Sequence, residues 1–532
     1  MVPPTVVSEA VGADATRFRY NNWNNQVARH ALMIPERTAF RFRGETITWS
    51  QLHTRVEKLA DALSRRGVGF GDRVIILMLN RPEYIEIVLA ANALGAIAVP
   101  VNFRLTAPEV AYLVADSGAK AIVSEGPLVP LAAAARSQAE GIELSIVVGA
   151  EPEGDSVAYE DLVAEEGEPH PQVDIPNDTP ALIMYTSGTT GRPKGAVLTH
   201  SNLEAQSLTC IRAFRLFDET GVGFCASPMF HIAALGSMAP SLMLGTPTVI
   251  HPVGAFDPDE LLDVLEAEQV TSLFLVPVQW QAVCAAQQAK PRNLKLRNIS
   301  WGAAPSSDTI LRAMAETFPD AFNVAVFGQT EMSPITCVLD GDDAIRKLGS
   351  VGRVIPTIQA RVVDDEMNDV APGEVGEIVY RGPTMMREYW NNPTATSEAF
   401  HGGWFHSGDL VRVDEEGFVY VVDRKKDMII SGGENIYCAE VENVLFGHPK
   451  ILEAAVIGRP DAKWGEVPVA VVALKPGNDD LTLEELQPFL NEHLARYKHP
   501  KEIVIVDALP RNASGKVVKG ELRGGLPAVT QG

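Results

Sequence analysis

The sequence predicts an α/β protein: a large N-terminal domain of doubly wound sheets with a β-rich subdomain, followed by a small α+β C-terminal domain. Three observations predict this. Strand and helix patterns alternate up to about residue 350, a strand pattern of period two follows, and a separate set of strands and one helix closes the chain. With 532 residues the chain is too long for one hydrophobic core and predicts two to four domains.

The first part of the chain alternates between the two kinds of element. Apolar residues recur at helical spacing between Ser50 and Gly67, and these two residues are expected to cap that helix. Further helices are expected after Pro82, after Thr106 and from Asp257 onward. The strand runs among them are RVIILML, AIAVPV, KAIVS, ALIMY and TSLFLV. Such alternation predicts a parallel sheet with helices on its faces.

The later part changes twice. After about residue 350 the runs ARVVD, EVGEIVYRG and GFVYVVD alternate at period two between glycine turns, which predicts a smaller β-rich subdomain. In the last hundred residues, AAVIGR and VPVAVVAL read as strands and LTLEELQPFLNEHL as a helix capped by Thr482. The charged stretch DRKKD at 423–427 lies between these parts and is the predicted linker.

Composition limits the possible functions. The net charge of −23, from 68 acidic against 45 basic residues, argues against a nucleic-acid binder, so any polyanionic ligand needs a local positive pocket. The five cysteines lack C-x-x-C spacing, which favours free thiols in a reducing cytoplasm over disulfides or a zinc site.

Two stretches bear on membranes. Residues 1–20 lack the basic start and apolar run of a signal peptide and read as a loose N-terminal extension. Residues 220–256 contain no Asp, Glu, Lys or Arg, but four prolines interrupt them. Prolines at this frequency break a spanning helix, so we expect a buried helix and strand there and no transmembrane segment.

The most specific local pattern is YTSGTTGRPKG at 185–195, in which small hydroxyls and two glycines precede Lys194 and a third glycine follows it. Glycines let backbone N–H groups turn toward an anion and lysine adds a positive charge, so the loop suits a phosphate. It is not a P-loop, because Pro193 occupies the second glycine position and Gly195 the position of the Ser or Thr that binds magnesium. A magnesium ligand must therefore come from elsewhere.

Read together with FGQTE at 327–331, HSGDL at 406–410, DRKKDMIISGGEN at 423–435 and PRNASGK at 510–516, the loop resembles the adenylate-forming superfamily of acyl-CoA synthetases. Five motifs in the family's order and spacing carry this resemblance. Within the superfamily the chain looks most like fatty-acid–CoA ligases. The resemblance implies joining of a carboxylic acid to ATP, release of pyrophosphate, and transfer of the acyl group to coenzyme A with release of AMP.

The resemblance also implies a division of the chain. Residues 1–20 would be the extension, 21–423 the adenylation domain with its β-rich subdomain at 350–423, 424–429 a hinge, and 430–532 a mobile lid. Lys426 would be the pivot, and Gly432 and Gly433 would line the coenzyme A tunnel. No enzyme nucleophile is needed, so positioning and electrostatics would carry the rate.

The nucleotide site implied by the resemblance combines the motifs. The loop residues would hold the β- and γ-phosphates, Glu331 with Thr186 would hold Mg²⁺ through hard oxygens, and Lys516 would bridge the acid and the α-phosphate. Thr330 would contact the α-phosphate, Phe327 would pack on adenine, and Asp409 with Arg424 would bind the ribose. The ATP- and AMP-binding residues so implied are Thr186, Ser187, Gly188, Thr189, Thr190, Gly191, Lys194, Gly302, Ala303, Ala304, Phe327, Gly328, Gln329, Thr330, Asp409, Arg424 and Lys516.

By position in the family, the acyl pocket would contain Ile232, Ala233, Ala234, Gly236, Gly302, Gly328, Pro334 and Ile335. These small, apolar residues favour a medium- or long-chain aliphatic acid. The alternatives are an aryl or sterol-derived acid, or transfer of the acyl group to a carrier protein. His231 would be a gate between the acyl pocket and the thiol tunnel, or else a core histidine. A homodimer is plausible, and the sequence leaves peripheral membrane contact open.

Overall fold

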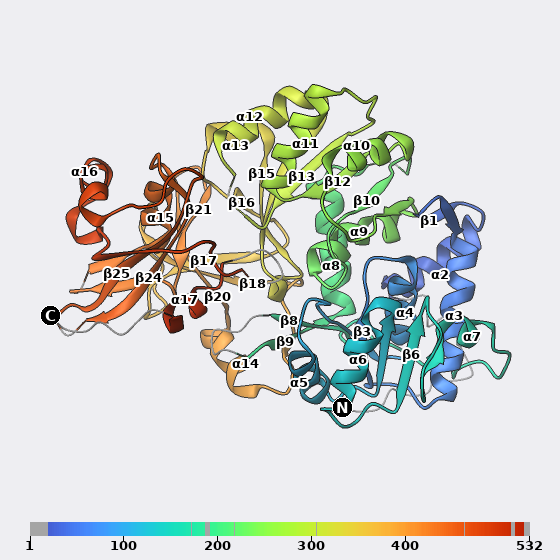
Figure 1. The fold of residues 1–532 in the computed structure, drawn as a ribbon. Coiled ribbons are helices and arrows are strands. Elements are labelled where there is room, and N and C mark those ends of the chain that lie inside the picture. The colour runs from blue at the N-terminus through green and yellow to red at the C-terminus, as the bar shows by residue number, and fades with distance from the viewer. Residues whose placement is uncertain are drawn as a thin grey trace. The chain divides into compact units, whose positions relative to one another are not determined.

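The computed structural model describes residues 20–171, 173–186, 192–217, 219–304, 306–432, 434–461, 463–511 and 517–525 (Figure 1). The chain divides into two compact units. The first unit comprises the residues up to Ala360 with Tyr380–Phe405, and the second comprises Arg361–Val379 with the residues from His406 onward. The predicted β-rich stretch 350–423 is thus divided between the two units, with Arg361–Val379 and the residues from His406 onward grouped with the C-terminal residues. A boundary at residue 423 stays a prediction.

One sheet of the first unit has eight strands in the order β19-β9-β8-β4-β3-β5-β6-β7. Strands β3 to β8 run parallel, whereas β9 is antiparallel to both of its neighbours. The strands are β3 (Arg73–Leu77), β4 (Ile97–Pro100), β5 (Ala121–Glu125), β6 (Leu144–Val148), β7 (Val157–Ala158), β8 (Pro180–Thr186), β9 (Lys194–Thr199) and β19 (Glu388–Tyr389).

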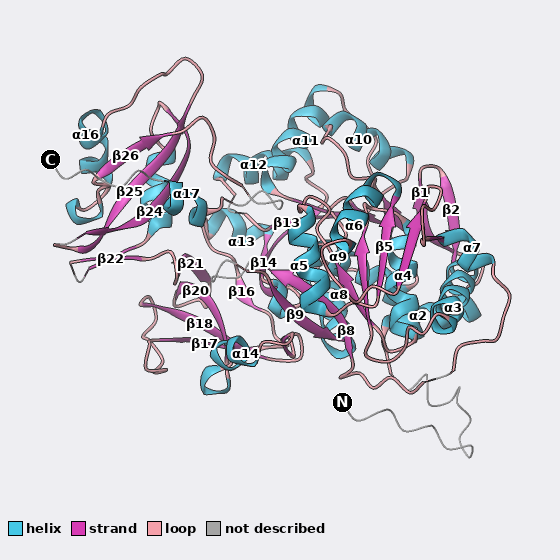
Figure 2. Cartoon of the chain, turned by 60° about the horizontal axis from the view of Figure 1, so that its bottom comes forward, coloured by secondary structure: helices cyan, strands magenta, loops and turns pink. Residues whose placement is uncertain are grey.

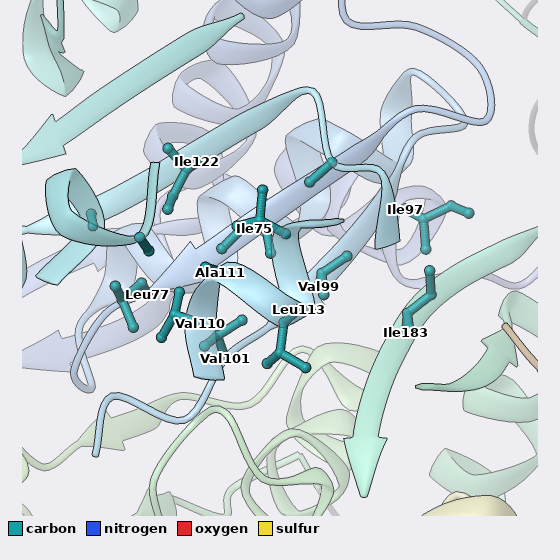
Figure 3. Close-up of a cluster of buried hydrophobic side chains, with 14 of the residues drawn as sticks. Ile75, Leu77, Ile97, Val99, Val101, Val110, Ala111, Leu113, Ile122 and Ile183 are labelled. Carbon is teal, nitrogen blue, oxygen red and sulfur yellow. The ribbon is translucent and has the colours of Figure 1, made fainter. Parts of the chain in front are cut away.

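Helices connect the strands of this sheet and cover it, because the apolar strands bury their side chains against helices. Ile75, Val99, Ile122 and Ile183 of four strands share one buried cluster with Leu113 of a helix (Figure 3). The associated helices are α3 (Trp49–Arg65), α4 (Pro82–Ala93), α5 (Ala107–Ser117), η2 (Gly126–Leu128), α6 (Val129–Arg136) and α7 (Tyr159–Ala164).

The expected start of α3 is wrong by two residues. Thr48, not Ser50, is the N-cap: its hydroxyl accepts a hydrogen bond from the Gln51 N–H at 3.2 Å, and the Gln51 side chain accepts one from the Thr48 N–H at 2.9 Å. This reciprocal capping box satisfies two N–H groups, which explains the earlier start. The helix start expected at Asp257, which is the N-cap of α10 (Pro258–Ala267), and the cap expected at Thr482 are confirmed.

The second sheet of the first unit has nine strands in the order β16-β15-β14-β13-β12-β10-β11-β1-β2. The strands from β14 through β1 run parallel, and antiparallel strands flank them at both edges. The strands are β1 (Thr38–Phe42), β2 (Glu45–Thr48), β10 (Gly223–Cys225), β11 (Thr248–Ile250), β12 (Ser272–Leu275), β13 (Asn298–Gly302), β14 (Phe322–Gly328), β15 (Ile335–Asp340) and β16 (Arg353–Val354).

The helices that accompany this sheet include the charge-free stretch of the sequence. That stretch folds as β10, the 13-residue α9 and β11, and within the described residues no helix is long and apolar enough to cross a membrane. The remaining helices of the first unit are α2 (Trp23–Met33), α8 (His200–Ala213), α9 (Ile232–Leu244), α10 (Pro258–Ala267), α11 (Pro277–Ala289), α12 (Asp308–Thr317), η3 (Thr330–Met332), α13 (Gly341–Arg346), α14 (Pro393–Ala399) and η4 (His401–Gly403).

The second unit contains the two smaller sheets (Figure 2). A four-stranded sheet has the order β17-β18-β20-β21, and a five-stranded sheet has the order β23-β22-β25-β24 with β26 parallel to β25. The strands are β17 (Gln359–Val363), β18 (Val375–Arg381), β20 (Phe405–Val413), β21 (Val419–Arg424), β22 (Ile429–Ser431), β23 (Glu434–Ile436), β24 (Ile451–Asp461), β25 (Gly465–Leu474) and β26 (Glu502–Ile505).

The helices of the second unit pack on the five-stranded sheet. Val441 and Leu445 of one helix and Leu486 of another are buried with Val456 of β24 and Val472 of β25, the two long strands of the sheet. These helices are α15 (Cys438–Phe446), α16 (Leu483–His493), η5 (Arg496–Lys498) and α17 (Lys519–Gly525). The predicted fold class, a large α/β domain followed by a β-rich part and a small α+β part, is confirmed.

Candidate active site

The two ends of the glycine-rich loop are held by strand pairing. Thr186 ends β8 and Lys194 begins β9, and these residues are direct partners in the antiparallel pair. The loop residues Ser187, Gly188, Thr189, Thr190 and Gly191 lie outside the described residues. Beyond the loop, the Tyr112 hydroxyl donates to the Pro193 carbonyl at 3.2 Å. The loop is therefore anchored at both ends on a rigid sheet.

Glu331 lies in the short helix η3 and is only 8% exposed. Its Oε1 atom accepts two hydrogen bonds, from the Thr186 hydroxyl at 3.2 Å and from the Tyr389 hydroxyl at 2.9 Å. The backbone carbonyl of Glu331 also accepts a hydrogen bond from the Met386 N–H at 2.7 Å. Burial, with the charge of Glu331, raises the pKa of Tyr389, so its hydroxyl stays protonated and donates.

These oxygens fit a magnesium ion that is shared with a substrate phosphate. Mg²⁺ takes hard oxygen ligands and is commonly bound by one or two carboxylates, waters and phosphate oxygens. The Glu331 carboxylate and the Thr186 hydroxyl converge as such donors. Within the described part of the chain, no group of three or more His, Cys, Asp or Glu residues could hold a metal ion.

The residues expected around adenine follow β13 and β14. Gly302 ends β13, and a Cβ atom there would lie 2.2 Å from the Val326 carbonyl oxygen of β14, so the close strand approach requires glycine. The next residue, Ala303, has a positive φ of 64°, which strains a residue with a side chain. Ala303 and Ala304 are exposed and Phe327 is half-buried, so all three are open to a ligand.

The predicted acyl-pocket residues come together around the start of α9 and the segment after η3. A Cβ atom on Gly236 would lie 3.3 Å from Pro334, and one on Gly328 would lie 1.8 Å from the Pro334 carbonyl oxygen. His231 is the N-cap of α9, and its Nδ1 accepts a hydrogen bond from the Ala233 N–H at 3.2 Å. Ala233 is half-buried, whereas Ile232, Ala234 and Ile335 are fully packed in the core.

A cavity of about 40 Å³ lies one helical turn further along α9. Ser237 of α9 lines it, four residues after Ala233 and so on the same helix face, and Ser300 of β13 lines it, two residues before Gly302 and so on the same strand face. Ser237 was not among the predicted site residues, although its spacing from Ala233 could have identified it. The other lining residues include Phe214, Phe224, Pro240, Ser241, Leu244, Thr246, Leu273 and Phe274.

In the second unit, the two residues expected to bind ribose are neighbours. Asp409 of β20 and Arg424 of β21 are direct strand partners, and the Arg424 Nε lies 2.6 Å from Asp409 Oδ1. Asp409 is 2% exposed, so its carboxylate needs such a partner. The Arg424 guanidinium therefore lies beside this buried carboxylate, and the pair brings a negative charge and several N–H groups together.

Glu377, which the sequence did not single out, organises the HSGDL loop. Its carboxylate accepts hydrogen bonds from the Gly408 N–H at 2.9 Å and from Lys425 at 3.2 Å, and it lies 2.9 Å from His406 Nδ1. Burial opposes the charge, but His406, this N–H and Lys425 hold the pKa of Glu377 below its usual value. No local sequence pattern marks Glu377, because its partners lie on other strands.

The predicted hinge and tunnel residues lie along the next turn. Lys426 is exposed in the turn between β21 and β22. Gly432 has a positive φ of 61°, and a Cβ atom there would lie 2.7 Å from the Trp464 ring, so glycine is required for two reasons. Gly433 and Lys516 lie outside the described residues.

Comparison with known proteins identifies the class. The chain matches the AMP-binding enzyme family over residues 27–390 and the C-terminal domain of AMP-binding enzymes over residues 440–516. The chain belongs to this family, and it is an acyl-CoA synthetase of the adenylate-forming superfamily. As an AMP-forming acid–CoA ligase, it has a carboxylic acid, ATP and coenzyme A as its substrates.

Individual relatives act on different acids. A feruloyl-CoA synthase of Amycolatopsis sp. is 41% identical over 93% of this chain and 97% of its own length. A long-chain-fatty-acid–CoA ligase of Mycobacterium tuberculosis is 37% identical over 90% of this chain and 92% of its own. Among solved structures, the o-succinylbenzoate CoA synthetase of Bacillus subtilis, in complex with its acyl-adenylate intermediate, has a TM-score of 0.82 and 31% identity, covering 96% of this chain and 99% of that chain.

Proposed function

We propose that this ligase activates a compact aromatic carboxylic acid. In the first step a carboxylate oxygen of the acid attacks the α-phosphorus of ATP, and the bond to the departing pyrophosphate breaks. In the second step the thiol of coenzyme A, losing its proton, attacks the acyl carbon, and AMP leaves with that oxygen. The products are an aryl-CoA thioester, AMP and pyrophosphate.

The observation that carries the choice of acid is the small cavity that lies one turn of α9 after Ala233. In this proposal a long acyl chain would run from the adenylate along α9 and past Ser237, and so toward the cavity that Ser237 lines. The cavity has a volume of about 40 Å³, well below the ~150 Å³ of a cavity that takes up a benzene molecule. A compact aryl acid can end above Ser237 and does not need this space.

The relatives support the same choice. The feruloyl-CoA synthase and the o-succinylbenzoate CoA synthetase both act on acids that contain an aromatic ring, as their names state.

Roles for the nucleotide site follow the same proposal. The loop from Thr186 to Lys194 restrains the β- and γ-phosphates, and Asp409 with Arg424 holds the ribose. Glu331 and Thr186 hold Mg²⁺, which when bound neutralises phosphate charge and so assists the departure of pyrophosphate. Phe327 packs on adenine beside the backbone of residues 302–304, and Gln329 and Thr330 follow toward the α-phosphate.

The second half-reaction uses other residues of the C-terminal part. Lys516 serves adenylation as a positive charge at the α-phosphate. The lid then turns about Lys426, so that Gly432 and Gly433 line the coenzyme A tunnel, while His231 gates the passage between acyl pocket and thiol. Torsion changes at Lys426 disturb no core, because this residue is exposed in a turn.

A medium- or long-chain fatty acid is the second candidate. The long-chain-fatty-acid–CoA ligase of Mycobacterium tuberculosis favours it, as do the apolar residues Ile232, Gly236 and Pro334. If it is correct, the side chains around the cavity must move apart to admit the chain. Each buried methylene would then add about 0.8 kcal/mol, close to fourfold in specificity, until the space is filled.

A panel of acids separates the two candidates. Acid-dependent pyrophosphate exchange and CoA-thioester formation would be measured with acetate, hexanoate, dodecanoate, benzoate, cinnamate and ferulate. We expect the highest kcat/KM with an aryl acid, and a Ser237→Phe variant, which blocks the cavity, should retain that activity. A kcat/KM that climbs steadily to dodecanoate, and that Ser237→Phe abolishes, would instead establish the fatty acid.

A further inference from the structure

Tyr389 occupies a position in the first unit that strand pairing fixes. It belongs to β19, where its direct partner on β9 is Ala196. Lys194 lies two residues before Ala196, and so on the same face of β9. Its ammonium therefore lies over the Tyr389 ring, 5.3 Å from the ring centre. The ring thus stands beside the lysine that ends the glycine-rich loop.

The hydroxyl of Tyr389 reaches the carboxylate of Glu331. It donates to Glu331 Oε1 at 2.9 Å, the same oxygen that accepts from the Thr186 hydroxyl at 3.2 Å. Among the hydrogen bonds and ion pairs of the described residues, none involves Glu331 Oε2, and none joins Glu331 to Lys194. One carboxylate oxygen is therefore fixed by two hydroxyls, and the other is left for a cation.

We propose that Tyr389 is a positioning residue of the metal site, whose hydroxyl holds the Glu331 carboxylate in the orientation that binds Mg²⁺. This inference rests on the proposed function, in which Glu331 and Thr186 hold that ion. Groups that orient a metal ligand typically change metal affinity or activity by ~10–100-fold when they are removed. The ring of Tyr389 adds a second effect, since it lies beside Lys194 and keeps a competing positive charge on its own face.

A purely structural role makes a different prediction. Buried tyrosine hydroxyls usually find a hydrogen-bond partner, and loss of one lowers stability without any relation to metal. Tyr185 provides the matched case. Its hydroxyl donates to the Asp116 carboxylate at 2.7 Å, on the strand that ends in Thr186. Tyr185→Phe therefore removes the same kind of hydrogen bond close by, but not one to Glu331.

The test compares metal binding in Tyr389→Phe and Tyr185→Phe. Mn²⁺, a paramagnetic substitute for Mg²⁺, would be titrated into each full-length protein with a non-hydrolysable ATP analogue, and bound metal would be followed by electron paramagnetic resonance. We expect the Mn²⁺ Kd of Tyr389→Phe to rise about 10-fold or more, with metal-free binding of the analogue unchanged. The Tyr185→Phe variant should keep the wild-type Kd, and high Mg²⁺ should restore pyrophosphate exchange in Tyr389→Phe.

Two outcomes overturn the inference in distinguishable ways. A wild-type Mn²⁺ Kd in Tyr389→Phe, whatever its loss of thermal stability, shows that the hydroxyl does not orient the ligand. A Glu331→Gln variant, measured alongside, should lose Mn²⁺ binding. If Glu331→Gln also keeps the wild-type Kd, the metal site of the proposed function is wrong and the role of Tyr389 falls with it. An equal rise in both tyrosine variants likewise overturns the inference, because it signals a general disturbance.

Discussion

Replacement of Gly302 by alanine should damage stability and nucleotide chemistry together. The added Cβ atom would lie 2.2 Å from the Val326 carbonyl oxygen, whereas such contacts are essentially never closer than 3.0 Å. The backbone oxygen cannot rotate away, so β13 and β14 must separate by close to 1 Å at their ends. Overpacking of this kind costs about 1–3 kcal/mol.

The same displacement affects the proposed adenine and acyl walls, because Gly302 belongs to both. A 1 Å misplacement of bound reactants can cost on the order of 10²-fold in rate. We therefore expect Gly302→Ala to lower the melting temperature and to reduce kcat/KM for acid-dependent pyrophosphate exchange by about that factor. Gly254→Ala is the control, since a Cβ atom there would meet nothing within 4 Å. Unchanged kinetics and stability in Gly302→Ala would refute the argument.

Three further predictions test the other parts of the site. Lys516→Ala should slow adenylation by on the order of 10²-fold or more but convert supplied acyl-adenylate to the CoA thioester normally; equal losses in both steps would contradict its role. Lys426→Pro, which fixes φ near −65°, should retain pyrophosphate exchange and lose thioester formation; normal thioester formation in the folded variant would remove the pivot. Burial opposes the ionisation of Glu377, but the hydrogen bond from His406 and the charge of Lys425 hold its pKa low. The charged carboxylate therefore stabilises the folded protein at pH values above the pKa that Glu377 has in the unfolded chain. This stabilisation is lost as the pH falls through the pKa that Glu377 has in the folded protein. Urea unfolding at several pH values should therefore show that the free energy of unfolding falls less steeply toward acid pH in Glu377→Gln than in the wild type. The same fall in both proteins would exclude Glu377 as its source.

Much of the fold could be predicted because its local signals agree. The buried strands at 73–77 and 121–125 are apolar on both faces, and helices of the first unit begin at recognisable caps such as Thr106 and Asp257. The α3 start was misjudged at Ser50 because several hydroxyl residues compete there, and only the partner Gln51 decides between them. The grouping of Arg361–Val379 with the C-terminal residues could not be predicted, since it depends on contacts between distant strands.

In the candidate site, the motifs identified the functional residues but not the residues that hold them in position. Glu331 and Thr186 could be named from their motifs, and the structure places them 3.2 Å apart. Tyr389 and Glu377 could not, because each acts through a partner far away in sequence, and only strand pairing brings the two together. A residue that orients a functional group therefore leaves a weaker local signal than the group itself.

The same distinction explains why the acid is harder to identify than the reaction. Phosphate and magnesium demand particular atoms at particular distances, so their ligands recur as motifs. An acyl pocket demands only a shape, and many side chains make the same shape. In the function that we propose, that shape depends on the small cavity that Ser237 of α9 and Ser300 of β13 line, two elements joined by no motif. Substrate preference must therefore be read from packing, and our proposal of a compact acid rests on that packing.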